Sequence, residues 1–189
     1  MDINFNYNIL KKAKLENVGY TLKLKGNLGS VTAFNGDFKE TYHGEEFHFH
    51  NPSEHTFNGM HYPLEMHIVH KSKSRGIEDT HCVLAIYFQL TSEKNDFLST
   101  LNLKDLSEIE SLNLHGFVEK VGTKSMYMYK GSLTTPPCTE CVQWVSLNNA
   151  QNISEEQLHL FKEHFKMHNQ LPNARGICPI CSRIIHRKV

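Results

Sequence analysis

The sequence has no long apolar run and no excess of charge of either sign. No apolar stretch approaches the roughly 20 residues that a helix needs to cross a bilayer, so we expect no transmembrane segment. Lys plus Arg and Asp plus Glu each total 20, which gives a formal net charge of zero and no indication of a nucleic-acid or anionic-membrane partner. Residues 1–6 lack the basic and apolar segments of a signal peptide.

Internal repeats, low-complexity segments and a strand–helix–strand alternation are also missing. The 189 residues, 39% hydrophobic and 21% charged, suit one globular domain with a single core. Strand patterns outnumber helical ones, which predicts a mainly β protein with a mostly antiparallel sheet. The expected strands are residues 20–25, 47–50, 64–70, 82–88 and 126–130, with a turn at 26–29. The clearest helix is 154–166, where Ser154 and Gln157 form a capping box.

Cysteine is scarce, and its pattern leaves several interpretations open. Four of the five cysteines form two C-x-x-C pairs, Cys138 with Cys141 and Cys178 with Cys181. Such pairs are typical of a zinc ribbon, but the separation between them exceeds the usual spacing. A disulfide within the set, or unpaired thiols, is the alternative.

Histidine, in contrast, is abundant and is placed where it can bind a metal. His48 and His50 lie two apart in one apolar run, and His67 lies in another. A glutamate stands two places before the first and the third, at Glu46 and Glu65. Because side chains alternate faces along a strand, each of these histidines would share a face with its glutamate.

Three neutral imidazoles leave the fourth tetrahedral position of a zinc ion open, which is typical of a catalytic site. Metal-binding histidines usually donate their second ring N–H to a carboxylate or a carbonyl, and Glu46 and Glu65 are placed for that role. The alternative is two strands whose histidines simply face solvent.

These residues are part of a larger set that resembles the α-class carbonic anhydrases. The matching motifs run in order from about residue 15 to 185, and they are 47–50, 53–56, 65–70, 131–137, 140–142, 173–175 and Arg183. The resemblance implies one α-carbonic anhydrase-like domain over residues 1–189: a large, twisted, mostly antiparallel sheet with short peripheral helices and a conical cavity reaching zinc. It implies zinc-dependent reversible hydration of CO₂ to bicarbonate and a proton by zinc-bound hydroxide. The substrate would thus be a small molecule, whereas the oligomeric state is not predicted.

The resemblance also assigns roles to individual residues. His48, His50 and His67 match the zinc ligands, with Glu46, Glu65 and Asn173 behind them. Thr134 matches the residue that orients the hydroxide and passes its own proton to a carboxylate, which is Glu54 here. Thr135 would lie beside bicarbonate. The apolar wall that holds CO₂ corresponds to Val69, Val83, Leu133, Val142 and Trp144, while His55 and His70 match buried structural histidines.

The chain departs from the family pattern at three places. Glu46 stands where the family usually has glutamine, and the extra negative charge predicts a higher pKa for zinc-bound water. Tyr20 occupies the position of the histidine proton shuttle, and a phenol is a poor relay at neutral pH. The family's N-terminal segment is expected to be absent. Cys138 matches a cysteine that pairs with that segment in secreted members, which favours a secreted or extracytoplasmic location.

Two other functions compete with catalysis. A carbonic-anhydrase-like binding or scaffold protein with little or no turnover would share the fold, although inactive relatives typically lose ligand histidines and this chain has all three. A zinc-ribbon interaction module would explain the cysteine pairs but none of the histidines.

Overall fold

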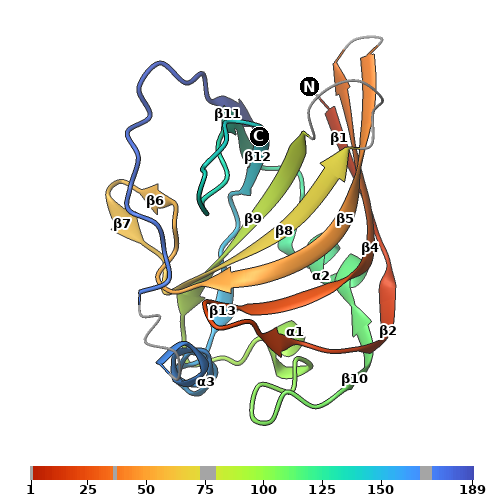
Figure 1. Ribbon diagram of the computed structural model, residues 1–189, viewed down its shortest axis with the longest axis vertical. Helices are drawn as coiled ribbons and strands as arrows, with labels where there is room; N and C mark the ends of the chain where they lie inside the picture. Colours follow the sequence, from red (N-terminus) through yellow and green to blue (C-terminus); the bar gives the residue numbers. More distant parts are fainter. Residues whose placement is uncertain (1, 36–37, 73–79, 167–171) are drawn as a thin grey trace.

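A computed structural model of the protein describes residues 2–35, 38–72, 80–166 and 172–189 (Figure 1). Within these residues, the dominant element is a ten-stranded sheet. Its strands follow the order β1-β4-β5-β8-β9-β12-β11-β14, with β3 beside β4 and β13 beside β9. Most pairs are antiparallel, whereas β12 and β13 both run parallel to β9, so the sheet is mixed. The expected mainly β, mostly antiparallel class is confirmed.

The strands on one side of the sheet are β1 (Asp2–Tyr7), β3 (Glu16–Asn17), β4 (Leu22–Asn35), β5 (Phe38–His50) and β8 (Leu64–Ser72). Those on the other side are β9 (His81–Leu90), β11 (Met126–Gly131), β12 (Val142–Leu147), β13 (Gln151–Ile153) and β14 (His186–Lys188). Separate small pairs are formed by β2 (Ile9–Ala13) with β10 (Ile109–Asn113), and by β6 (Thr56–Phe57) with β7 (Met60–His61). The helices are α1 (Asp96–Ser99), α2 (Leu114–Val121) and α3 (Glu155–Lys166).

The two faces of the sheet have different roles. On β5, Phe47 and Phe49 are fully buried in the main hydrophobic core, which also takes in Met66 and Ile68 of β8. The intervening side chains of both strands project from the opposite face, as the period of two requires. This second face therefore holds the histidines, while the first supplies most of the folding energy through apolar burial.

The sheet is curled, so that its two edge strands approach each other at one end. Asp2 of β1 forms an ion pair with Lys188 of β14, with Oδ1 and Nζ 3.0 Å apart. Figure 1 shows the two chain termini close together on that side.

The turn expected at residues 26–29 is wrong, because β4 continues through them. The β4–β5 register shifts between Lys25 and Gly29, so the glycines belong to a bulge. Gly29 has a φ of +110°, and a Cβ there would collide with the backbone carbonyl of Asn6 on β1. The glycine is thus required by close strand packing rather than by a chain reversal.

The helix expected at 154–166 is confirmed as α3. The Gln157 N–H donates to Ser154 Oγ (3.2 Å), and the Ser154 N–H donates to Gln157 Oε1 (3.3 Å), which is the reciprocal pattern of a capping box. Leu158, Phe161 and Phe165 are buried along one side of the helix.

Candidate metal centre

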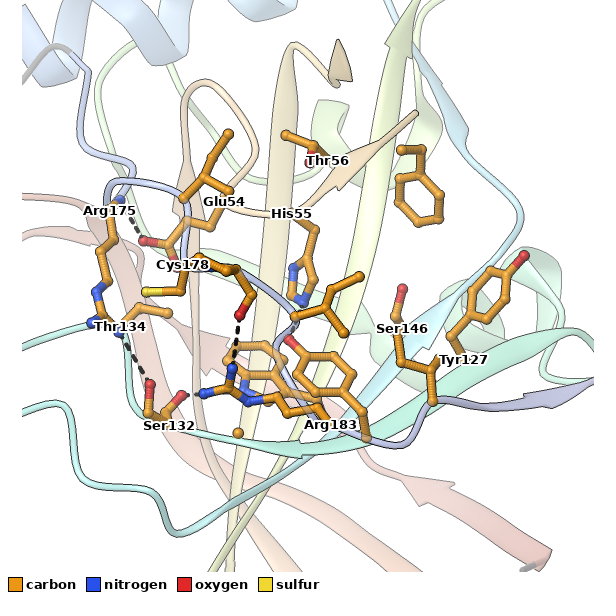
Figure 2. Close-up of a pocket in the computed structure, with 18 of the residues that line it drawn as sticks. Glu54, His55, Thr56, Tyr127, Ser132, Thr134, Ser146, Arg175, Cys178 and Arg183 are labelled. Atoms are coloured by element: carbon orange, nitrogen blue, oxygen red, sulfur yellow. Dashed lines mark hydrogen bonds between the residues drawn. The ribbon is translucent and has the colours of Figure 1, made fainter. Parts of the chain in front are cut away.

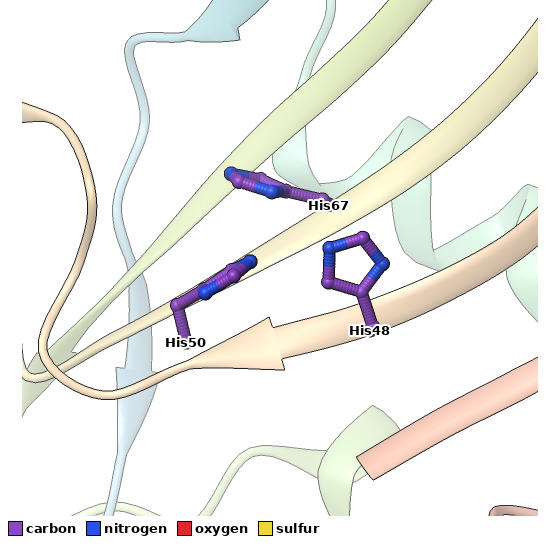
Figure 3. A group of neighbouring side chains, drawn as sticks. All are labelled: His48, His50 and His67. Atoms are coloured by element: carbon purple, nitrogen blue, oxygen red, sulfur yellow. The ribbon is translucent and has the colours of Figure 1, made fainter. Parts of the chain in front are cut away.

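The three histidines predicted to bind a metal come together on the inner face of the sheet. His48 and His50 lie on β5, and His67 of β8 pairs directly opposite His48. Figure 3 shows the three rings facing one another. Their ring centroids are 4.6–5.3 Å apart, and one nitrogen of each ring lies within 4.8 Å of the other two. Such a group can hold a single metal ion.

Two of the rings use one nitrogen for a protein contact and keep the other available. His67 Nε2 lies 2.6 Å from Glu65 Oε1, and His50 Nδ1 lies 3.2 Å from the carbonyl oxygen of Asn173. Carboxylate and carbonyl oxygens only accept, so both ring nitrogens donate. This leaves the lone pairs of His67 Nδ1 and His50 Nε2, and the latter is buried without a hydrogen-bond partner among the described residues.

The third ring has a weaker contact of the same kind. His48 Nδ1 lies 3.3 Å from Glu46 Oε1, at an angle that does not make a full hydrogen bond. The Nε2 atom of His48 is then the one left for a metal. Three imidazole nitrogens with protein partners behind them match the donor set of a catalytic zinc site.

The environment keeps these imidazoles neutral. Burial lowers the pKa of His48, His50 and His67 below its ordinary value, because a charged ring is poorly solvated there. Neutral rings offer the lone pairs that metal binding needs, so the site is ready for a cation at neutral pH.

Glu65 accepts most of the hydrogen bonds behind the site. Its Oε1 accepts hydrogen bonds from His67 Nε2 and His55 Nδ1, both at 2.6 Å, and its Oε2 accepts from the backbone N–H groups of Glu54 (2.7 Å) and His55 (3.0 Å). Burial alone would raise the pKa of this carboxyl group, but His55 and His67 outweigh it and hold the pKa well below its usual value. Glu65 therefore stays ionised and fixes the orientation of His67.

Glu46 has a partner that the sequence did not predict. Its Oε1 lies 2.8 Å from Nζ of Lys23, which projects from β4 opposite His48. Burial acts to raise the pKa of Glu46, yet His48 and Lys23 together lower it to about 2. The expectation of an uncompensated negative charge behind His48 therefore needs correction, since the lysine cancels that charge.

Glu54 lies under the metal centre with one oxygen engaged. Its Oε1 accepts from the backbone N–H of Arg175 at 2.8 Å. Its Oε2 lies 3.9 Å from His67 Nδ1 and is buried with no hydrogen-bond partner in the described part of the chain. A buried acceptor without a donor is costly and rare, so this oxygen is available to a further donor.

A family model for eukaryotic-type carbonic anhydrases matches residues 1–189. The chain belongs to this carbonic anhydrase family. Alpha carbonic anhydrase 7 of Arabidopsis thaliana is 31% identical over 192 residues, which cover 97% of this chain and 66% of that relative.

Solved structures agree with this membership. The α-carbonic anhydrase of Thermovibrio ammonificans in complex with the inhibitor sulfanilamide is 30% identical, with a TM-score of 0.76 over 95% of this chain and 76% of that one. Dioscorin complexed with ascorbate is 27% identical, with a TM-score of 0.83 over 98% of this chain and 77% of that one. The chain spans slightly less than two thirds of the first relative, and the matches carry two kinds of name, so family membership alone does not establish activity.

The predicted threonine of this carbonic anhydrase fold lies beside Glu54. Both Thr134 and Glu54 line a cavity of about 510 Å³, together with His55, Trp144 and Arg175 (Figure 2). Arg175 Nη1 donates to Ser132 Oγ (3.1 Å), so Arg175 joins the threonine loop to the carboxylate. Thr134 and Glu54 thus line the same cavity, and the described residues show no hydrogen bond between them. Thr135 is exposed at the next position.

All five residues predicted to line the CO₂ pocket fall into one apolar cluster. Val83, Val142 and Trp144 are buried in it, and Val69 and Leu133 pack against them. The indole of Trp144 lies next to His67, with ring centroids 4.9 Å apart. The sheet thus sets a small apolar surface directly beside the metal ligands.

Tyr20 and Asn173 occupy the outer side of the centre. Tyr20 is 46% exposed, and its hydroxyl lies 3.4 Å from Lys23 Nζ. Asn173 receives the His50 hydrogen bond, donates to the Tyr20 carbonyl (3.0 Å), and accepts from the Asn51 N–H (2.7 Å). Asn173 thus supplies the carbonyl acceptor behind His50.

Three residues around the site, Tyr7, Tyr129 and Lys23, have contacts that the sequence did not predict. Tyr129 hydroxyl lies 2.7 Å from His55 Nε2 and continues the Glu65 network, and His70 Nε2 lies 2.9 Å from the buried Tyr7 hydroxyl. In the sequence, Lys23 is only one residue of an alternating strand pattern. The alternation places Lys23 on the polar face, but nothing in a single sequence states which residue faces it across the sheet.

The cysteines take no part in the metal centre. Among the residues that the structure describes, none of the five forms a disulfide, and the possible metal-binding groups contain no cysteine. Among the described residues, the two C-x-x-C pairs thus form neither a disulfide nor a four-cysteine metal group in this structure. Likewise, no helix in the described ranges is long and apolar enough to cross a bilayer.

Proposed function

We propose that this protein is a zinc-dependent carbonic anhydrase that catalyses the reversible hydration of CO₂ to bicarbonate and a proton. The observation that carries the proposal is the arrangement of the three buried imidazoles. His50 and His67 each have one nitrogen bound to protein and one directed to a common point, and His48 completes the group.

A zinc ion held by these nitrogens would supply a Lewis acid that brings the pKa of a bound water to about 7, a value for which carbonic anhydrases as a class are the standard example. The three neutral rings leave the charge of the ion uncompensated, which favours this acidification. The buried Glu65 keeps His67 in the required tautomer.

Thr134 and Glu54 supply the second part of the chemistry. Glu54 Oε2 is an acceptor without a partner in the cavity that Thr134 also lines, so we assign it as the acceptor of the Thr134 hydroxyl proton in a hydrogen bond. The Thr134 oxygen can then accept a hydrogen bond from the attacking water, which turns the nucleophilic lone pair toward CO₂. This pairing also discriminates against anions that carry no proton to donate.

The apolar cluster around Trp144 supplies the third part. CO₂ has little polarity for hydrogen bonding, so an apolar surface next to the ligands is the appropriate binding site. Val69, Val83, Leu133 and Val142 complete this surface, and Thr135 would contact the bicarbonate product.

A binding or scaffold protein with the same fold is the second candidate, supported by the dioscorin match. The complete histidine group, together with Thr134 and Glu54, favours catalysis over this alternative. A protein that only binds ligands has no need for a buried, unpartnered carboxylate oxygen 3.9 Å from one of three clustered imidazoles.

Metal analysis combined with CO₂ hydration kinetics separates the two. We expect about one zinc per chain and a hydration rate that sulfanilamide abolishes. The His50→Ala variant should lose both zinc and activity. A chain that holds zinc but remains inert, with or without added bicarbonate, would instead support the binding protein.

A further inference from the structure

The ion pair between Lys23 and Glu46 lies directly behind a metal ligand. Lys23 Nζ is 2.8 Å from Glu46 Oε1, and the same oxygen is 3.3 Å from His48 Nδ1. The side chains of Lys23 and Glu46 are only 13% and 19% exposed. Glu46 Oε1 therefore contacts both the Lys23 ammonium and the imidazole of His48, one of the three candidate metal ligands.

The fold places this pair on the metal face by strand register. Lys23 of β4 is opposite His48 of β5, and Lys25 is opposite Glu46. Lys23 reaches diagonally to Glu46, whereas Lys25 is exposed. Tyr20 adds a further contact, because its hydroxyl lies 3.4 Å from Lys23 Nζ and its ring centroid lies 5.7 Å from the same atom.

The ammonium group of Lys23 lies mostly buried near a site for a cation, a position that is unfavourable unless its charge is balanced. By itself it would repel a divalent ion held by His48. With Glu46 between them, 3.3 Å from His48 Nδ1, the charges of the ammonium and the carboxylate cancel. The metal position then has a carboxylate behind His48 without an additional net charge.

We infer that Lys23 sets the charge behind the metal centre: it cancels the negative charge of Glu46 and so acts on zinc binding through Glu46 and His48. This inference rests on the proposed function only in assuming that the three histidines bind zinc. It assigns a role to a residue of β4, a strand that contributes no metal ligand among the described residues.

The inference predicts an asymmetric pattern of zinc affinity. Glu46→Gln leaves the ammonium uncompensated and loosens His48, so zinc should bind 10- to 100-fold more weakly. Lys23→Met leaves an uncompensated carboxylate behind His48, so zinc affinity should increase, and an unchanged affinity would count against the inference. The double variant removes both charges, and its affinity should return to within about threefold of the parent. Lys25→Met is the matched control and should change nothing.

Zinc dissociation constants from competition with a chromophoric chelator test this pattern at one fixed pH. Thermal unfolding of the metal-free variants checks that each is folded. Lys23→Arg keeps the charge and should behave like the parent. Equal weakening by both single substitutions, with no recovery in the double variant, would overturn the inference. A parent that binds zinc and shows the pattern but does not hydrate CO₂ would overturn the proposed function alone. A parent that binds no zinc would overturn both.

Discussion

Glu65 and His67 are joined by a hydrogen bond of 2.6 Å between Oε1 and Nε2, in a place where neither side chain reaches solvent. The carboxylate receives three further hydrogen bonds, so all of its neighbours are donors. An amide group at this position would turn an N–H toward one of those donors.

The substitution Glu65→Gln should therefore weaken both the metal site and the fold. We expect zinc affinity to fall 10- to 100-fold, because His67 loses its fixed tautomer. We expect the metal-free protein to lose about 3 kcal/mol of stability, because a buried charge network is broken. Chelator competition and urea unfolding measure the two effects. Glu110 on β10 is exposed, and Glu110→Gln is the control that should change neither.

Replacement of Thr134 tests the catalytic chemistry apart from metal binding. Thr134→Ala should lower kcat/KM by about 100-fold, the usual effect of losing one positioned hydrogen-bonding group. Zinc content should not change, since Thr134 is not in the histidine group. Thr134→Ser should keep most of the activity. If the alanine variant were as active as the parent, the pairing with Glu54 would have no role in the reaction.

Tyr20 allows a test of proton release. Because a phenol relays protons poorly at neutral pH, turnover should be limited by proton transfer to solvent. Imidazole-type buffers should therefore raise kcat while leaving kcat/KM unchanged. Tyr20→His should give a higher kcat in weak buffer and a smaller response to added imidazole. Stopped-flow measurement of kcat over a range of buffer concentrations tests this prediction. If buffer concentration did not change kcat of the parent, proton transfer to solvent would not be rate-limiting.

His70 predicts a pH dependence of stability. Burial lowers its pKa from 6.5 to about 4, and its ring accepts from the Tyr7 hydroxyl and donates to the Cys82 carbonyl as a neutral tautomer. The unfolded chain binds the proton more readily, so the contribution is complete above pH 6.5 and is lost as the pH falls toward 4. The loss should be about 3 kcal/mol.

Urea unfolding of the metal-free protein between pH 7 and 4 measures this dependence. His70→Gln should be less stable at pH 7 but should have a shallower slope over this range. The same slope in both proteins would show that other groups are responsible.

The histidine group could be predicted from the sequence because it depends on local periodicity. Alternation along β5 puts His48 and His50 on one face whatever lies next to the strand, and the glutamate two places before His67 shares its face for the same reason. The apolar cluster around Trp144 followed from the family resemblance. Contacts between the residues of this cluster are visible only in the folded sheet.

Features that depend on pairing between distant strands could not be predicted in this way. Lys23 contacts Glu46 only because of the β4–β5 register, and a bulge shifts that register at Gly29. The same bulge explains why the glycines at 26–29 resembled a turn. A glycine that allows a neighbouring strand to pack closely cannot be distinguished, from sequence alone, from a glycine in a turn.

The β5–β8 register has a consequence for folding. His48 faces His67 across these strands, and a second irregularity lies between Gly44 and Glu46. A slip of one residue would turn His67 toward the apolar core and leave the two β5 histidines without it. Zinc can therefore bind tightly only to chains with correct strand pairing, and it would stabilise them by mass action. If zinc has the catalytic role proposed above, the same ion would also favour the correctly paired fold.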